Sequence, residues 1–232
     1  MAVSSPLRAL IFDFDGLILD TETPDFTVLA EQYQAYGATL LAERWVLGLG
    51  TFGRYDPYQE LAELSGQQLD IAALQAAHRR RYLEICAEQP LRPGIPELLA
   101  YAAETGIVCA VASSGSRNWV EGWLAKHAIR GMFACVRTRD DVEHVKPAPD
   151  LFLSAAAGIG IAPSECLVLE DSINGMRAAA AAGMRCVGVP LPLLAGLAFP
   201  PVALMLASLA DLPPAELIAR AASGSGSAPA PE

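Results

Sequence analysis

Two carboxylates stand two residues apart at the end of the first apolar run of the sequence. The predicted strand within residues 8–20 runs into Asp13 and Asp15, and Gly16 follows them. Side chains of a strand alternate between its faces, so the two carboxylates would point the same way if the strand continued through both. Ligands of open α/β sheets bind at the carboxyl ends of strands, where this pair would lie. Taken alone, the pair fits a structural turn as well as a catalytic site.

Further polar side chains follow later predicted strands or open predicted helices. Ser113 and Ser114 follow the second strand, where their hydroxyls and the next backbone N–H groups could hold a phosphate at a helix start. Lys146, one of two lysines in the chain, precedes a helix opened by proline and could neutralise an oxyanion. Glu170 and Asp171 end another apolar strand.

The chemistry of these residues is complementary. Asp13, Asp15, Glu170 and Asp171 would repel one another strongly without a cation, and hard oxygen ligands beside a phosphate make Mg²⁺ the best candidate. Each feature alone has a plainer explanation: an ordinary Ser-Gly turn, a solvated lysine before a helix, or helix capping by the acids. Their shared position at the edge of a sheet makes coincidence a poor explanation for the whole set.

From about residue 91 onward, predicted strands and helices alternate. The strands are expected at residues 107–112, 133–137, 166–170 and 185–189, with a further one at 202–207. Alternation at this spacing implies right-handed crossovers between parallel strands. We therefore predict an α/β fold, with a mostly parallel sheet and helices on both of its faces.

Between the first strand and this alternating region the pattern is helical. No convincing strand occurs in residues 20–88, so we predict an all-helical second domain or lid, inserted there. The core would then comprise residues 1–19 and 89–215. Residues 216–232, which end in a stretch rich in Ser, Gly, Ala and Pro, are expected to form a disordered tail.

Composition narrows the compartment and the partners. The chain has 232 residues, 53% of them hydrophobic and 18% charged, so it can bury a core. A net charge of -10 argues against nucleic acid or an anionic membrane as a partner. The five cysteines lack metal-ligand spacing, which indicates reduced core thiols. With neither a signal peptide nor a membrane span evident, we expect a cytoplasmic, monomeric protein.

Four stretches resemble the motifs of the haloacid dehalogenase-like phosphatases, in the branch that includes the β-phosphoglucomutases and phosphoglycolate phosphatases. They are FDFDGLILDTE at 12–22, VASS at 111–114, VKPAPD at 145–150 and LEDSING at 169–175. The first and last of these motifs are highly specific. The resemblance implies a Rossmann-like core with a helical cap inserted after the first strand.

The resemblance also implies roles for the acidic residues. Asp13 would be the nucleophile that forms an aspartyl-phosphate, and Asp15 would be the general acid and base. Mg²⁺ would be bound by Asp13, by the backbone carbonyl of Asp15 and by Asp171, with Glu170 nearby or acting through water. Attack by a carboxylate on phosphorus requires that the charge of the transferring group be neutralised, which a metal would help to do.

Other residues would hold the substrate. The resemblance implies that Ser113, the backbone amide of Ser114 and Lys146 hold the transferring phosphoryl group. Arg54, in the helical insert, is our candidate for contacting a distal anionic or hydroxyl group of the substrate. A surface arginine would explain Arg54 equally well.

Several related activities fit less well. Dehalogenases of this family lack an acid at the position of Asp15, and phosphonatases use a cap lysine, whereas the lysines here, Lys126 and Lys146, lie outside the insert. The mutases carry a cap lysine, and a histidine near the position where this chain has Asp25. We therefore expect a phosphatase acting on a small phosphorylated metabolite such as a sugar phosphate. A β-phosphoglucomutase-type mutase is the alternative, and a phospho-accepting signalling module a remote one, because a proton shuttle and a lid favour turnover.

Overall fold

The computed structural model describes residues 7–49 and 55–224. Within this part, six strands form one parallel sheet in the order β3-β2-β1-β4-β5-β6. The strands are β1 (Ala9–Phe12), β2 (Val108–Ala112), β3 (Cys135–Arg137), β4 (Cys166–Glu170), β5 (Arg185–Gly188) and β6 (Leu204–Met205). The predicted parallel α/β sheet is confirmed, and β1 lies between β2 and β4.

The strands are apolar on both sides because helices cover both faces of the sheet. Leu10 and Phe12 of β1 pack on one face, whereas Ala9 and Ile11 pack on the other. On the first face lie α5 (Ile95–Thr105), α6 (Arg117–Lys126) and α9 (Pro214–Ser223). The second face is covered by α7 (Asp150–Ile159) and α8 (Ile173–Ala181).

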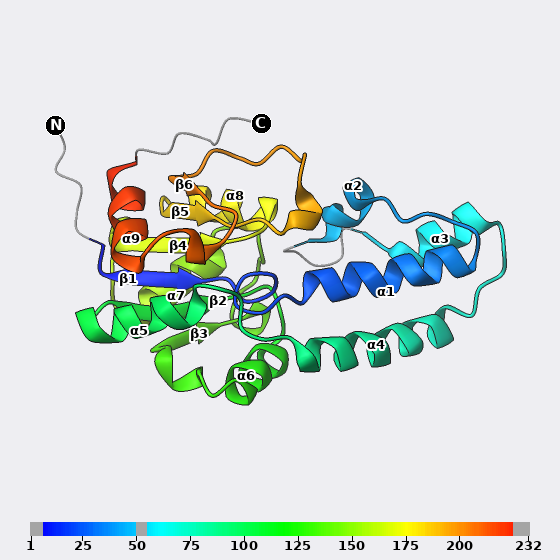
Figure 1. Cartoon of the computed structure of the whole chain (residues 1–232), viewed down its shortest axis with the longest axis horizontal. Helices are drawn as coiled ribbons and strands as arrows, with labels where there is room; N and C mark the ends of the chain where they lie inside the picture. The colour runs from blue at the N-terminus through cyan, green and yellow to red at the C-terminus, as the bar shows by residue number, and fades with distance from the viewer. Residues whose placement is uncertain (1–6, 50–54, 225–232) are drawn as a thin grey trace.

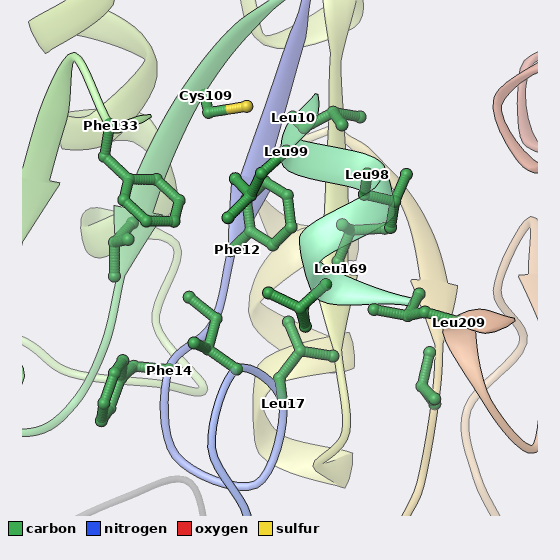
Figure 2. Packing of buried hydrophobic residues seen from close by; sticks show 14 of the residues in the cluster. Leu10, Phe12, Phe14, Leu17, Leu98, Leu99, Cys109, Phe133, Leu169 and Leu209 are labelled. Atoms are coloured by element: carbon green, nitrogen blue, oxygen red, sulfur yellow. The ribbon is translucent and has the colours of Figure 1, made fainter. Parts of the chain in front are cut away.

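The core on the first face is built around the ring of Phe12. Figure 2 shows this ring among Leu98 and Leu99 of α5 and Leu169 of β4. The ring of Phe133 meets that of Phe12 edge to face, with 5.6 Å between their centroids. This packing fixes the end of β1, from which the first acidic residues emerge.

The stretch 20–88, predicted to be all-helical, contains helices and no strand among its described residues. It contains α1 (Glu22–Ala35), α2 (Ala42–Trp45), α3 (Pro57–Ser65) and α4 (Ile71–Glu88). In Figure 1 this helical insert lies beyond the end of the sheet toward which the arrow of β1 points. Its own apolar cluster includes Leu29, Tyr33 and Leu61, and it also takes in Leu191 and Leu194 from the loop after β5.

The two chain segments that join the insert to the sheet are bonded to each other. Leu19 and Leu91 form an antiparallel bridge, and the backbone N–H of Arg92 donates to the carbonyl of Ile18 at 3.0 Å. The guanidinium of Arg92 also donates to the carbonyl of Gly16. The turn that carries the acidic pair is therefore held by the returning segment.

The tail expected from residue 216 was placed wrongly, because α9 extends through Ser223. Leu217 and Ala221, one helical turn apart, are fully buried in the core on the first face. The carbonyl of Ala222 accepts a hydrogen bond from Arg185 at 2.9 Å. This short apolar stripe is sufficient to dock the helix on the sheet.

The cysteines agree with the predicted reduced core thiols. All five cysteines are buried with free thiols. Among the described residues, no helix is both long and apolar enough to cross a membrane.

The two glycines that bound α5 allow a test of the packing. Both have positive φ, but a Cβ on Gly94 would lie 2.4 Å from the backbone carbon of Leu209, whereas one on Gly106 would meet nothing within 4 Å. We expect Gly106→Ala to lower the free energy of unfolding by about 1 kcal/mol, from backbone strain alone. Gly94→Ala should lower it by about 3 kcal/mol, since steric overlap adds to the strain. Urea denaturation measures both; equal losses would contradict the packing described.

Candidate active site

The turn after β1 carries the two acids that open the site. β1 ends at Phe12, directly before Asp13. The strand therefore does not continue through both carboxylates, which was the condition for predicting that they point the same way. The backbone N–H of Asp13 still donates to the carbonyl of Leu169 at 3.0 Å, which holds it against β4. Gly16 then turns the chain with a φ of 79°, and a Cβ there would lie 2.1 Å from Oδ2 of Asp171. Glycine is required at this close approach.

Lys146 lies between two of the predicted acids. Its side chain is buried, and its ammonium group donates to Oδ1 of Asp13 and, at 2.9 Å, to Oε1 of Glu170. The ammonium also lies 4.8 Å from the ring centroid of Phe152. A solvated lysine at a helix start is therefore excluded, and the cation is fixed beside the predicted nucleophile.

Glu170, the last residue of β4, faces the site, and Ser172 two residues later caps the next helix. The backbone N–H of Ser172 donates to Oε2 of Glu170 at 2.8 Å, and the hydroxyl of Ser172 accepts from the N–H of Gly175, which caps α8. A Cβ on Gly175 would lie 1.7 Å from Oε1 of Glu170. Ser172 is thus the cap of α8, whereas Glu170 directs a carboxylate oxygen at Lys146.

Three acids come close enough to share a metal ion. Asp13, Glu170 and Asp171 each offer a carboxylate oxygen, and these oxygens lie within 4.8 Å of one another. Oδ2 of Asp171 is buried without a hydrogen-bond partner among the described residues. A buried carboxylate oxygen without a partner is costly, and a hard divalent cation would satisfy it. The donor set therefore fits Mg²⁺.

Burial dominates the proton affinities of this cluster. It raises the pKa of Asp13 to about 8; Lys146 opposes the rise, whereas Glu170 and Asp15 add to it. The pKa of Asp171 is likewise raised well above its usual value, by burial and then by Glu170 and Asp13. Burial alone would lower the pKa of Lys146, but the carboxylates of Asp13 and Glu170 raise it. Lys146 therefore stays charged, and its ammonium group is bonded to both carboxylates.

Asp15 is oriented by three side-chain donors. Its Oδ1 accepts from the Thr21 hydroxyl at 2.9 Å and from the Trp119 indole N–H at 2.7 Å, and its Oδ2 accepts from the Ser113 hydroxyl at 3.3 Å. Burial raises the pKa of Asp15, although these hydrogen bonds oppose the rise. Asp15 thus retains its proton to a higher pH than a solvated aspartate would.

Thr21 and Trp119 were not among the site residues predicted from the sequence. Thr21 lies inside the first motif, so its proximity to Asp15 could have been noticed there. Trp119 is the third residue of α6, and its N–H donates to the hydroxyl of the N-cap residue Ser116. A helix that starts just after the Ser113 turn must place its first turn at this edge of the sheet, which was the available signal.

The serine turn after β2 lies at the same edge. Ser113 is fully buried, its N–H donates to the carbonyl of Arg137, and its hydroxyl accepts from the N–H of Gly115 at 2.9 Å. Ser113 and Ser114 line one cavity of about 470 Å³ together with Asp13 and Asp15. The predicted phosphate-binding turn therefore shares this space with Asp13 and Asp15.

The helical insert contributes to this cavity as well. Glu22, Asp25, Gly48 and Tyr82 line it from the insert, and Arg139 lines it from the sheet domain. Arg54, the residue proposed for substrate contact, lies outside the described residues. A molecule bound at Asp13 would consequently also touch the insert.

Comparisons with known proteins identify relatives of this chain. A family model described as "Haloacid dehalogenase-like hydrolase" matches residues 10–189. The Bacillus subtilis protein "Putative phosphatase YhcW" is 40% identical over 206 residues, which cover 89% of this chain and 94% of that protein. The "Probable pseudouridine-5'-phosphatase" of Drosophila melanogaster is 36% identical, over 88% of this chain and 90% of its own.

Two solved structures of one related protein align with most of this chain. CbbY from Rhodobacter sphaeroides has been solved in complex with phosphate and, as a mutant, in complex with xylulose-(1,5)bisphosphate. The two structures align with TM-scores of 0.68 and 0.69, each at 30% identity. They cover 88% and 89% of this chain and 96% of CbbY.

The raised pKa of Asp13 predicts how the metal-free protein responds to pH. Its pKa is 3.8 in the reference state and about 8 in the fold, so the folded protein binds more protons between these values. The contribution of Asp13 to the free energy of unfolding is therefore fully present below its reference pKa and is lost as pH rises through its pKa in the fold. We expect the EDTA-treated protein to melt at a lower temperature at about pH 8.5 than at about pH 5.5. Asp13→Asn should flatten this dependence, and a melting temperature that rises with pH would contradict it.

Proposed function

The chain belongs to the haloacid dehalogenase-like hydrolase family and is a phosphoric monoester hydrolase, and we propose that it is a Mg²⁺-dependent phosphatase acting through an aspartyl-phosphate. Its substrate would be a small phosphorylated metabolite, a sugar phosphate. The observation that carries this proposal is the buried ammonium of Lys146 between Asp13 and Glu170. Asp13 in turn lines a cavity together with Asp15.

In the first step, a carboxylate oxygen of Asp13 attacks phosphorus and the bond from phosphorus to the leaving oxygen breaks. Asp15, whose pKa is raised by burial, gives its proton to that oxygen. In the second step, a water molecule attacks the phosphorus of the aspartyl-phosphate while Asp15 takes a proton from it. Phosphate leaves, and the carboxylate of Asp13 is regenerated.

The negative charge of the phosphoryl group needs fixed positive partners. Lys146 is held in place by Asp13 and Glu170, and Ser113 and Ser114 line the cavity that Asp13 also lines. Preorganised donors of this kind stabilise charge that develops during the reaction. Asp13, Glu170 and Asp171 would hold Mg²⁺, which when bound supplies further neutralisation of the phosphoryl oxygens.

The helical insert would act as a cap that selects the leaving group. Residues 20–88 would form this cap and residues 1–19 and 89–223 the catalytic core, with the core extended to include α9. Glu22 and Asp25 face the cavity from the insert, and carboxylates are good acceptors for sugar hydroxyls. The sugar bisphosphate bound by CbbY supports this substrate class. Arg54 remains our proposed contact for a distal group.

Removing the nucleophile should abolish turnover. We expect Asp13→Asn to lower kcat by at least about 1,000-fold, while circular dichroism and thermal melting show a folded protein, because the amide has the shape of the buried carboxylate. The matched control is Asp70→Asn, at the exposed N-cap of α4, where the side chain accepts the N–H of Ala73. Asparagine caps as well as aspartate, so this variant should keep full activity. Activity retained by Asp13→Asn would refute the nucleophile assignment.

The reaction class and the metal can be tested together. Phosphate release from a panel of sugar and small-acid phosphates should require Mg²⁺, stop on addition of EDTA and return when Mg²⁺ is restored. Activity indifferent to chelation would remove the metal from the proposal. β-Glucose 1-phosphate serves as the diagnostic member: glucose 6-phosphate formed with little free phosphate would show a mutase instead.

A further inference from the structure

Trp119 touches both the proton-transfer carboxylate and the helical insert. Its indole Nε1 donates to Oδ1 of Asp15 at 2.7 Å. Its ring stacks on that of Tyr82 in α4, with 5.6 Å between the centroids and 16° between the planes. Tyr82 itself lines the cavity beside Asp15.

An indole N–H differs from the hydroxyl donors around Asp15. Hydroxyls can reverse and accept, whereas an indole N–H can only donate. Because Oδ1 accepts from the indole of Trp119, which can only donate, and at 2.9 Å from the Thr21 hydroxyl, these contacts favour Oδ2 as the oxygen that carries the proton of the acid form of Asp15. Oδ2 is the oxygen that faces the serine turn, 3.3 Å from the Ser113 hydroxyl. The same oxygen would lie 3.1 Å from a Cβ on Gly115.

We propose that Trp119 is a positioning residue: its indole N–H keeps the transferable proton of Asp15 on the oxygen that faces the phosphate-binding turn, and its ring ties this orientation to the helical insert. The inference rests on the proposed function, since it concerns the proton given to the leaving oxygen. A stack of rings continues from Tyr82 to His78, whose centroids are 5.8 Å apart. Nε2 of His78 lies 3.2 Å from Oδ1 of Asp25, so the contact reaches a side chain that lines the cavity.

A pair of substrates of nearly one shape separates positioning from general damage. Phenyl phosphate needs a proton on its leaving oxygen far more than p-nitrophenyl phosphate, because p-nitrophenolate is the weaker base. Loss of a hydrogen bond to a charged or reacting group costs about tenfold to hundredfold. We expect Trp119→Phe to lower kcat/KM for phenyl phosphate by that factor, and for p-nitrophenyl phosphate by less than about threefold.

The matched control is Trp123→Phe, one turn further along α6. The Trp123 ring meets that of Trp119 at 5.4 Å and lies under the ammonium of Lys126, so this variant removes an indole from the same helix away from Asp15. It should leave the ratio of the two kcat/KM values unchanged. An equal loss on both substrates in Trp119→Phe would show a merely structural role, and no loss would show no role; either result overturns the inference. A wild-type protein inactive on every phosphate ester would instead refute the proposed function.

Nuclear magnetic resonance tests the contact even if Trp119→Phe does not fold. The chain has three tryptophans, and their indole N–H signals can be assigned with Trp45→Phe and Trp123→Phe. Asp15→Asn should shift the remaining Trp119 signal more than the other two. A Trp119 signal that does not respond would overturn the inference.

Discussion

The site depends on the interaction of the Lys146 ammonium group with the carboxylates of Asp13 and Glu170. This ammonium group is buried and bonded to two carboxylates, and a third, that of Asp171, keeps an oxygen without a hydrogen-bond partner in the described part of the chain. Burying ions is unfavourable unless each is paired, so this cluster stabilises the fold poorly. Its arrangement is better explained by binding: a cation and a phosphoryl group would supply the missing charges together.

The strand order explains how distant residues form this cluster. β1 lies between β2 and β4, and all three are parallel, so their carboxyl ends meet at one edge. Asp13, Ser113 and Glu170 stand at or directly after those three ends, while Lys146 arrives from the loop before α7. Apolar side chains on both faces fix the strands, and rigid strands can hold charged groups close together despite their repulsion.

Much of the arrangement was predictable because it rests on local patterns. Apolar runs that end in acids or serines gave the sheet and the residues at its edge. The end of β1, the bridge between Leu19 and Leu91 and the indole bond to Asp15 depend on contacts between distant segments, which a local pattern does not contain. The helix α9 was missed for another reason: its buried stripe is short and is followed by a stretch rich in small residues, which obscured Leu217 and Ala221.

The two reacting carboxylates are held in different ways, and the proposed reaction gives a reason. Asp13 is fixed by the sheet and Lys146, and its proposed attack on phosphorus would be the same for every phosphate ester. In the proposed reaction Asp15 would give its proton to the leaving oxygen, whose surroundings change with the substrate. Its orientation depends on Trp119, and the ring stack from Trp119 leads to the insert, where Asp25 accepts the Trp45 indole N–H at 2.8 Å. The residues that would recognise a leaving group are thus in contact with those that orient its proton donor, so substrate choice and proton transfer would be linked through one set of packed rings.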